Sequence, residues 1–199
     1  MNVTVVNILD LVKENGEDAI AGYLSQFSCK RSDETESLNP DIEEFLKRDA
    51  IAFAKQKVSV SHIVTDRDDG AILGYFTITH KALNIPASGL SNTTKRKMAR
   101  YATLNSSTNT YTVSAFLIAQ FGKNYGVDNG ERMTGAQLMR YAEELLRSVQ
   151  RDVGGGVEYL DCEAHAGLIR FYEGEGFRLF GERFSEKDGR RYLQYMRFF

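Results

Sequence analysis

Cysteine, closely spaced metal ligands and long apolar runs are scarce in this chain, and each shortage excludes a class of protein. Two cysteines, Cys29 and Cys162, among 199 residues are too few for a disulfide scaffold or a zinc site with four cysteine ligands. His62, His80 and His165 share no close metal-ligand spacing, so no metal is expected. The N-terminal stretch has no basic leader and falls short of the roughly 20 apolar residues that a membrane span needs. We therefore expect a reduced, soluble, cytoplasmic protein with no membrane partner.

Charge and hydrophobicity are both close to average. Lys and Arg number 25 against 27 Asp and Glu, and 42% of the residues are hydrophobic. These values exclude disorder by composition and a surface coated in positive charge, so broad nucleic-acid binding is disfavoured. A chain of 199 residues buries roughly 70% of its unfolded surface. We expect a single domain over residues 1–199.

The first third of the chain begins with an apolar stretch over 3–12 and then contains two segments with helical features. Residues 19–27 favour helix over strand. Asn39 and Pro40 signal a second helix start, because Asn can accept from an unpaired amide and Pro suits the first helical turn. Apolar residues then recur at helical spacing, at Ile42, Phe45, Leu46 and Ala50.

A strand hairpin and an irregular excursion are predicted next. Strands over 59–65 and 71–79 are joined by the turn residues Asp68, Asp69 and Gly70. Residues 81–109 break the alternation of the strands and contain one short helix with a basic run, formed by Lys95, Arg96, Lys97 and Arg100. Because no aromatic residues are interleaved, a solvated helix face is favoured over an RNA contact.

The second half of the chain alternates strands and helices. An apolar run over 111–119 predicts a central strand, and apolar spacings of three and four from Gly135 to Val149 predict the clearest helix of the chain. A strand over 157–162 and a helix over 168–172 follow, and the turn 185–189 joins two terminal strands over 178–184 and 191–199. The apolar stretch from Tyr192 to Phe199 can complete its own sheet or add to that of a second copy.

The segment from Gly130 to Leu138 has the features of a phosphate-binding loop. A strand, a glycine-containing loop and an amphipathic helix together present free backbone amides and the positive end of a helix dipole. Arg132 adds a cation, and Gly135 allows the backbone to approach a ligand closely. The segment lacks both the Lys-Ser/Thr pair of a P-loop and a full GxGxxG pattern. On its own, a glycine at a helix start is more often only a turn.

A second element resembles a known family. The stretch from Ala164 to Phe177, an apolar helix ending in Tyr172, a charged pair and Gly-Phe, resembles the late motif of the GNAT superfamily of N-acetyltransferases. Arg132-x-x-Gly135 stands where that family has Arg/Gln-x-x-Gly-x-Gly/Ala, with Gln137 at the last small-residue position. In the alternative alignment Gly135 takes the last position, and Met133 and Gly130 take the earlier ones.

The resemblance covers residues 27–177 and implies an α/β (α+β) fold. In that fold a mixed, mostly antiparallel sheet with splayed central strands is flanked by helices. Residues 27–46 also look like the opening of GNAT proteins that are toxins of toxin–antitoxin pairs. The resemblance thus implies acetyl-CoA as the donor, an amine-bearing substrate and an antitoxin-like partner, with a homodimer as a further option.

The resemblance also assigns site residues. In the family, the strand before the phosphate loop pairs with the pantetheine arm of coenzyme A, and the loop holds the pyrophosphate. The matching pantetheine positions are Ile118, Gln120, Phe121, Gly122 and Lys123, and the matching pyrophosphate positions are Arg132, Met133, Thr134, Gly135 and Ala136. Tyr172 matches the tyrosine that protonates the departing thiolate, a transfer that is chemically reasonable from a phenol.

No general base stands out from the sequence. Asp161, Glu163 and His165 lie at the end of a strand near the expected site, but surface carboxylates are common and His165 can simply cap the next helix. Cys29 and Cys162 are expected to be core residues, because direct acyl transfer needs no cysteine nucleophile.

We therefore predict an acetyl-CoA-dependent N-acetyltransferase with Tyr172 as general acid. One alternative is a toxin-type enzyme acting on aminoacyl-tRNA, which needs a local basic stripe such as residues 95–100. The near-neutral charge favours a small amine or a protein amine over RNA. Another alternative, supported by the departures at Gln137 and His165, is a non-catalytic acyl-CoA-binding module.

Overall fold

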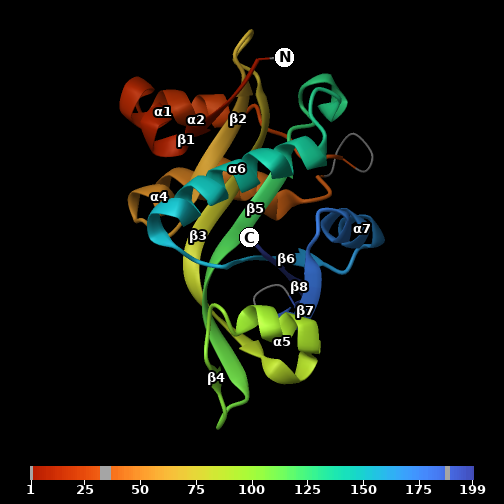
Figure 1. Ribbon diagram of the computed structural model, residues 1–199. Coiled ribbons are helices and arrows are strands. Elements are labelled where there is room, and N and C mark those ends of the chain that lie inside the picture. Colours follow the sequence, from red (N-terminus) through yellow and green to blue (C-terminus); the bar gives the residue numbers. More distant parts are fainter. Residues whose placement is uncertain (1, 32–36, 187–188) are drawn as a thin grey trace. The chain divides into compact units, whose positions relative to one another are not determined.

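The structure is a computed structural model that describes residues 2–31, 37–186 and 189–199 (Figure 1). Its strands are β1 (Val3–Asn7), β2 (Val60–Asp66), β3 (Ile72–Pro86), β4 (Leu104–Asn105), β5 (Thr110–Lys123), β6 (Val157–Glu163), β7 (Arg178–Ser185) and β8 (Arg190–Phe198). Its α-helices are α1 (Ile8–Asn15), α2 (Glu17–Leu24), α3 (Pro40–Glu44), α4 (Ala50–Lys55), α5 (Asn92–Met98), α6 (Gly135–Val153) and α7 (Ala166–Gly174). A π-helical turn, η1 (Phe45–Asp49), joins α3 to α4, and the short 3-10 turns are η2 (Ala87–Gly89) and η3 (Asp128–Gly130). The turn predicted at 185–189 falls partly outside the described residues.

The strands follow the order β1-β2-β3-β5-β6-β8-β7, and β4 pairs with β5. The β5–β6 pair is parallel, whereas β1–β2, β2–β3, β4–β5, β6–β8 and β7–β8 are antiparallel. The parallel register joins Ala115–Leu117 to Val157–Tyr159, and both strands continue beyond it. The predicted mixed, mostly antiparallel α/β sheet is confirmed, and the short parallel register fits the splay expected of its central strands.

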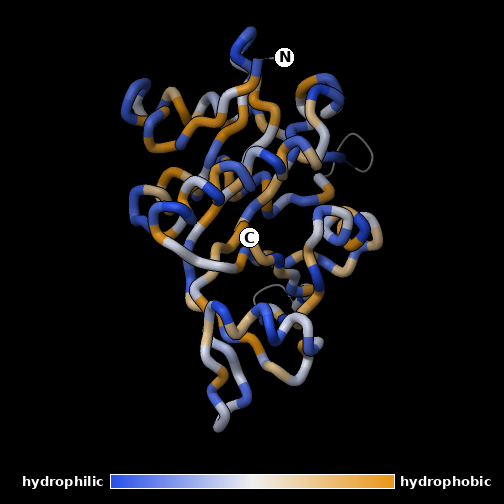
Figure 2. Tube along the Cα trace, in the orientation of Figure 1, coloured by the Kyte–Doolittle hydropathy of each residue, from blue (hydrophilic) through white to orange (hydrophobic). Residues whose placement is uncertain are grey.

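The chain divides into two compact units. The first unit contains residues 1–79 and 119–144, and the second contains residues 80–118 and 145–199. Each has its own hydrophobic core: the first is built on residues such as Phe27, Leu46 and Tyr75, and the second on residues such as Ile85, Met98 and Val157. The hydropathy colouring shows apolar stretches along β3 and β5, which contribute to both units (Figure 2). None of the helices in the described ranges is both long enough and apolar enough to cross a membrane.

One local feature of the first unit was not predicted from the sequence, and another differs from the prediction. The N-terminal stretch begins with a strand, β1, which pairs with β2 before α1 starts. In the described residues around α3, no capping bond from the Asn39 side chain is seen, because the Asn39 backbone (φ -138°, ψ 67°) lies away from the extended conformation that a capping residue adopts. Pro40 does open the helix as predicted.

The excursion between β3 and β5 is more regular than predicted. β3 continues to Pro86, seven residues past the expected end at Thr79, because buried Leu83 and Ile85 alternate with exposed neighbours. The predicted short helix is confirmed as α5, whose start is capped by Ser91 Oγ accepting from Thr94 N–H at 3.2 Å.

Charge is divided unequally between the two units. The first unit has 11 Lys and Arg against 18 Asp and Glu, a formal charge of −7, whereas the second has 14 against 9, a formal charge of +5. Residues 80–118 contain five Lys and Arg and no Asp or Glu. The net charge of −2 thus combines a basic unit with an acidic one, so by itself it does not disfavour an RNA partner.

Candidate functional site

The N-terminus of α6, in the first unit, is shaped by a capping box. Thr134 N–H donates to Gln137 Oε1 at 2.8 Å, and Gln137 N–H donates to Thr134 Oγ1 at 3.1 Å. Gln137, the residue that departs from the family pattern, therefore stabilises the helix start. Gly135 and Ala136 are in the first turn of α6, where backbone amides have no acceptor carbonyl within the helix. These amides lie at the positive end of the helix dipole. This helix start is suited to an anion.

Arg132, predicted to contact the pyrophosphate, is surrounded by carboxylates. Its guanidinium forms ion pairs with Asp66, with Asp69 at 2.8 Å and with Asp128 at 3.9 Å. Hydrogen bonds to Asp69 and Asp66 raise its pKa further above the ordinary value. The side chain is 21% exposed and ties the β2–β3 hairpin to the loop before α6. The loop's attraction for an anion consequently depends more on backbone amides than on Arg132, and a phosphate contact by Arg132 stays a prediction.

Gly130 brings the same loop against the end of β5. Its φ of +72° is in the left-handed region, and a Cβ there would lie 2.9 Å from Lys123 Cε and 3.0 Å from Tyr125 Cδ1. Lys123 Nζ lies 4.7 Å from the centre of the Tyr125 ring, and burial, followed by the nearby Lys30, lowers the Lys123 pKa. A cation is thus present beside the loop that does not depend on Arg132.

The predicted pantetheine strand is closely packed at Gly122. A Cβ at this position would lie 2.9 Å from Ile42 Cγ2 and 3.0 Å from Phe27 Cζ, so residues before β2 cover this part of β5. Of the predicted contact residues, Ile118 and Met133 are buried, Gln120, Phe121 and Lys123 are half-buried, and Thr134 and Ala136 are exposed. The side chains of Ile118 and Met133 are therefore not available to a ligand.

Asn124 is a structural residue of this region that the sequence did not reveal. Its buried side chain donates to Ile72 O at 2.7 Å and accepts from the amides of Ser28 and Gly126, both at 2.9 Å. Tyr125 N–H also donates to Ser28 O at 2.7 Å. These bonds hold the segment around Ser28 at the end of β5. In the sequence Asn124 is only a polar residue after an apolar strand, which is equally typical of a loop.

Tyr172 lies on α7 in the second unit. The residue is 7% exposed, and its ring packs at centroid distances of 5.0 Å from Phe171, 6.0 Å from Phe177 and 6.4 Å from Tyr195. Burial, followed by the nearby Cys162, raises the pKa of Tyr172 above its ordinary value. The phenol therefore keeps its proton at neutral pH, as a general acid requires.

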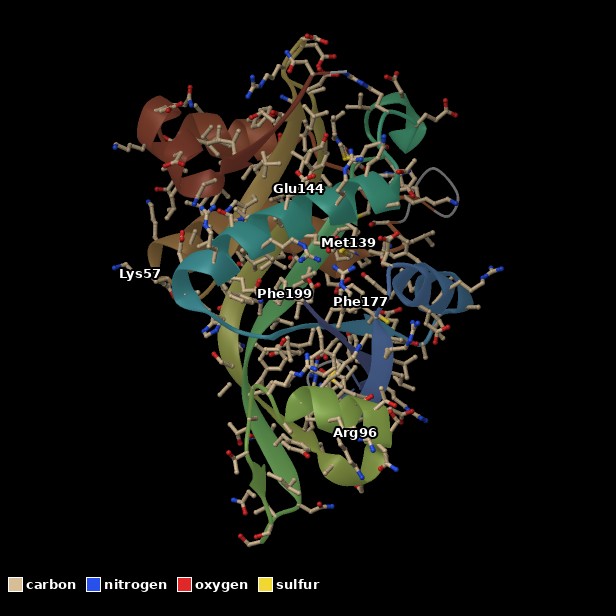
Figure 3. All side chains as sticks on the ribbon, in the orientation of Figure 1. Lys57, Arg96, Met139, Glu144, Phe177 and Phe199 are labelled. Carbon is tan, nitrogen blue, oxygen red and sulfur yellow. The ribbon has the colours of Figure 1, made fainter. Side chains whose placement is uncertain are left out.

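A buried ion pair braces the turn that follows α7. Arg197 Nε lies 2.6 Å from an oxygen of Glu158, a residue that is 1% exposed. The same guanidinium donates to Glu175 O at 2.6 Å and lies 4.5 Å from the centre of the Phe177 ring. Phe177 lies beside α7 (Figure 3). Glu158 and Arg197 thus connect β6 and β8 to the helix that carries Tyr172, a link that their separation of 39 residues hides in the sequence.

The candidate bases named from the sequence are already engaged. Asp161 accepts from Arg183 at 2.8 Å and from Gln194 at 3.1 Å, and Glu163 pairs with Arg190 at 2.5 Å. His165 caps α7 as expected, with Nδ1 accepting from Gly167 N–H at 3.1 Å. A neutral His165 then carries its proton on Nε2 and has no unused lone pair for an amine proton. The structure singles out none of the three as base.

Both cysteines are buried. Burial raises the pKa of Cys29 to about 12 and that of Cys162 to about 11, so both thiols stay protonated near neutral pH. Within the described ranges, no group of three His, Cys, Asp or Glu side chains is arranged to hold a metal ion.

Comparison by sequence finds no relative, because no protein-family model matches the chain and no curated protein matches it. Comparison by structure gives many matches. AtaT complexed with acetyl-methionyl-tRNAfMet has a TM-score of 0.64 at 16% identity, covering 100% of this chain and 94% of that one. A mutant of the toxin AtaT, bound to the C-terminus of the antitoxin AtaR and acetyl-CoA, has a TM-score of 0.61 at 12% identity, covering 100% and 94%. A mutant of KacT has a TM-score of 0.65 at 15% identity, covering 98% and 95%. The chain therefore has the GNAT-like fold of AtaT and KacT.

Proposed function

We propose that this protein transfers an acetyl group from acetyl-CoA to an amine. The observation that carries the proposal is full-length structural similarity to AtaT, which has been solved with acetyl-CoA, combined with a suitable anion site at the start of α6. The buried phenol of Tyr172 supplies the second chemical requirement. The similarity to AtaT indicates the fold. The anion site at the start of α6 and the phenol of Tyr172 are what support acetyl transfer as the reaction.

The loop before α6 and the main chain of β5 would bind the donor. The amides of Gly135 and Ala136, at the positive end of α6, suit the pyrophosphate of coenzyme A. Lys123 adds a cation near this loop. The pantetheine amides would pair with the main chain of β5 from Ile118 to Lys123, where the side chain of Ile118 is buried and those of Gln120, Phe121 and Lys123 are half-buried. This assignment needs no direct phosphate contact from Arg132.

Tyr172 would supply the proton for the leaving group. The amine attacks the thioester carbonyl, so that a C–N bond forms while the C–S bond breaks and the amine loses a proton. Tyr172 donates its phenolic proton to the departing thiolate. Because its pKa is raised, the resulting phenolate is a strong base, and it regains a proton from the acylated amine, either directly or through water. The enzyme thus ends the cycle in its starting state.

Release of free thiol from acetyl-CoA, measured across a panel of amines, tests this function. In Tyr172→Phe the turnover is expected to fall by about 100-fold or more, with little change in the affinity for acetyl-CoA measured by calorimetry. Undiminished turnover would remove Tyr172 from the mechanism. Tight coenzyme A binding without transfer to any amine would support the non-catalytic module, and failure to bind coenzyme A would exclude both functions.

A second candidate concerns the acceptor: the amine is the α-amino group of an aminoacyl-tRNA. Two observations favour it, namely the solved complex of AtaT with acetyl-methionyl-tRNAfMet and the formal charge of +5 on the second unit. Radiolabelled acetyl-CoA offered to charged bulk tRNA, and separately to free amino acids, distinguishes this acceptor from a small amine. Transfer to free amino acids but not to charged tRNA would refute it.

The partners proposed alongside this activity are an antitoxin-like protein and a second copy of the chain. AtaT has been solved with the antitoxin AtaR. Co-expression with the product of the neighbouring gene, followed by light scattering of the purified protein, tests both partners.

A further inference from the structure

In the segment that includes the excursion between β3 and β5, residues 80–118, all charged side chains are positive. Residues 80–118 contain five Lys and Arg and no Asp or Glu. The rest of the chain has 20 Lys and Arg against 27 Asp and Glu. Buried Met98 anchors α5, while Arg96, Lys97 and Arg100 are exposed. In the described part of the chain no ion pair neutralises these side chains. Neighbouring cations without carboxylates repel one another, so this helix face gains most from binding an anion.

An aromatic platform adjoins these cations. Tyr101, which is 42% exposed, stacks on Phe198 of β8 with a centroid distance of 5.9 Å and an interplanar angle of 23°. Lys97 Nζ lies 5.8 Å from the centre of the Phe198 ring. Gly156 makes room for the Tyr101 ring, because a Cβ at position 156 would lie 2.0 Å from Tyr101 Cδ1. Tyr101 directly follows the basic run in the sequence, whereas Phe198, the ring on which it stacks, comes from 97 residues further along the chain.

We propose that this α5 patch, defined as Lys95, Arg96, Lys97, Arg100, Tyr101 and Phe198, binds the sugar-phosphate backbone of RNA. The proposal rests on the proposed function with aminoacyl-tRNA as acceptor, and it identifies the surface that would hold the body of that RNA. Arg96 on α5 is labelled in Figure 3. Cations combined with an exposed aromatic face are the means by which proteins bind nucleic acid without reading its sequence.

The dimensions and charges of the patch favour RNA over an acidic protein segment. Lys95, Arg96 and Lys97 lie on α5 and Arg100 in the turn directly after it, so at about 1.5 Å per residue the run extends over about 8 Å, enough to contact more than one phosphate of a strand. A polyanion is also attracted to the second unit, at +5, and repelled by the first, at −7. Tyr101 offers a ring on which a base or ribose can pack, which a run of Asp and Glu would not use.

The test measures binding of deacylated bulk tRNA as a function of KCl concentration. The variant is Lys95→Gln, Arg96→Gln and Arg100→Gln together, and Lys97 is kept because it packs on Phe198. The matched control removes three exposed cations of the first unit, with Lys13→Gln, Arg48→Gln and Lys57→Gln. If three phosphate contacts are lost, the slope of log K against log salt falls by about 2 to 2.7. In the wild-type protein, three such contacts would account for about a 20- to 40-fold loss of tRNA affinity when the salt concentration is raised from about 50 to 200 mM, and the triple variant should lack this part of the salt dependence. The control should change neither quantity comparably.

Tyr101→Leu provides an independent arm. It removes the ring but no charge, so it should weaken tRNA binding by about fivefold or more while the salt slope stays unchanged. Wild-type affinity in both the triple variant and Tyr101→Leu would overturn the proposal. Loss of affinity for a poly-glutamate peptide, with tRNA binding intact, would likewise overturn it by assigning the patch to an acidic protein.

The outcome for the α5 patch can be separated from the outcome for the proposed function. Coenzyme A affinity and thiol release with a small amine are measured on the same variants, and both are expected to remain at wild-type values. Intact acetyl transfer together with unaltered tRNA binding in the triple variant refutes the patch alone. Patch-dependent tRNA binding without acetyl transfer to any acceptor refutes the proposed function alone.

Discussion

His62 gives a prediction whose size follows from its surroundings in the first unit. The side chain, on β2, is 8% exposed and stacks on Phe76 at 5.5 Å with an interplanar angle of 16°. Its Nδ1 atom is buried without a hydrogen-bond partner among the described residues. Burial lowers the pKa of His62 to about 4, although a backbone hydrogen bond at Val60 and the charge of Asp10 oppose the shift. The folded protein therefore holds this imidazole neutral where an unfolded chain would protonate it.

The direction and size of the effect follow from proton linkage. A histidine with a lowered folded-state pKa contributes stability that is fully present above its unfolded pKa of about 6.5 and is lost as the pH falls to about 4. Between these limits the unfolded state binds one more proton than the folded state, so stability falls by about 1.4 kcal/mol per pH unit. Over the whole interval the loss is at most about 3 to 4 kcal/mol, a large part of a typical stability of 5–15 kcal/mol.

Urea denaturation at pH 7, 6, 5 and 4.5 measures this contribution. His62→Phe keeps a flat ring against Phe76 but cannot be protonated, so the difference in unfolding free energy from wild type should move in favour of the variant as the pH falls. Ile63→Val, on the same strand, is the control and should cost about 1 kcal/mol at every pH. A difference between His62→Phe and wild type that stays constant from pH 7 to 4.5 would refute the reasoning.

Three further predictions concern packing near the proposed sites. Thr134→Ala removes half of the capping box, so thermal unfolding should show a loss of about 1 kcal/mol, and calorimetry should show weaker binding of coenzyme A. Arg197→Met removes the cation that pairs with the buried Glu158 carboxylate and should cost about 3 to 5 kcal/mol by urea denaturation; adding Glu158→Gln should recover part of that loss, and the absence of recovery would contradict an electrostatic origin. Gly156→Ala should displace Tyr101, giving a lower melting temperature and weaker tRNA binding than wild type, whereas unchanged values for both would show that the ring moves aside without cost.

Much of the fold could be predicted because it is encoded locally. The apolar period of three and four residues sets the face that α6 buries, and Gly135 marks where this helix begins. The hairpin turn at Asp68-Asp69-Gly70 and the helix of the basic run were also readable, since turns and short helices depend on neighbouring residues. The position of Tyr172 on a short helix before a Gly-Phe turn was predicted on the same basis, and its catalytic role remains a proposal.

Properties that depend on residues far apart in the chain could not be predicted in this way. Arg132 looked like a free cation beside a glycine, but the β2–β3 hairpin places Asp66 and Asp69 on it from more than 60 residues away. Asn124 looked like an ordinary loop residue, yet it holds the segment around Ser28. No spacing in the sequence marks such pairs, because strand pairing and packing select the partners.

The sequence by itself thus determined most of the strands and helices from residue 59 onward and the chemical types of the candidate residues, because hydrophobic period, turn residues and capping act over a few positions. Tertiary structure alone decided which charges are neutralised and which stay available. Its pairings leave Arg132 among carboxylates, and its division into units turns a net charge of −2 into an acidic and a basic unit. The packing of β8 also supplies Phe198 to the basic helix. Electrostatic attraction and aromatic contact depend on distance in space, which the chain sets only when it folds.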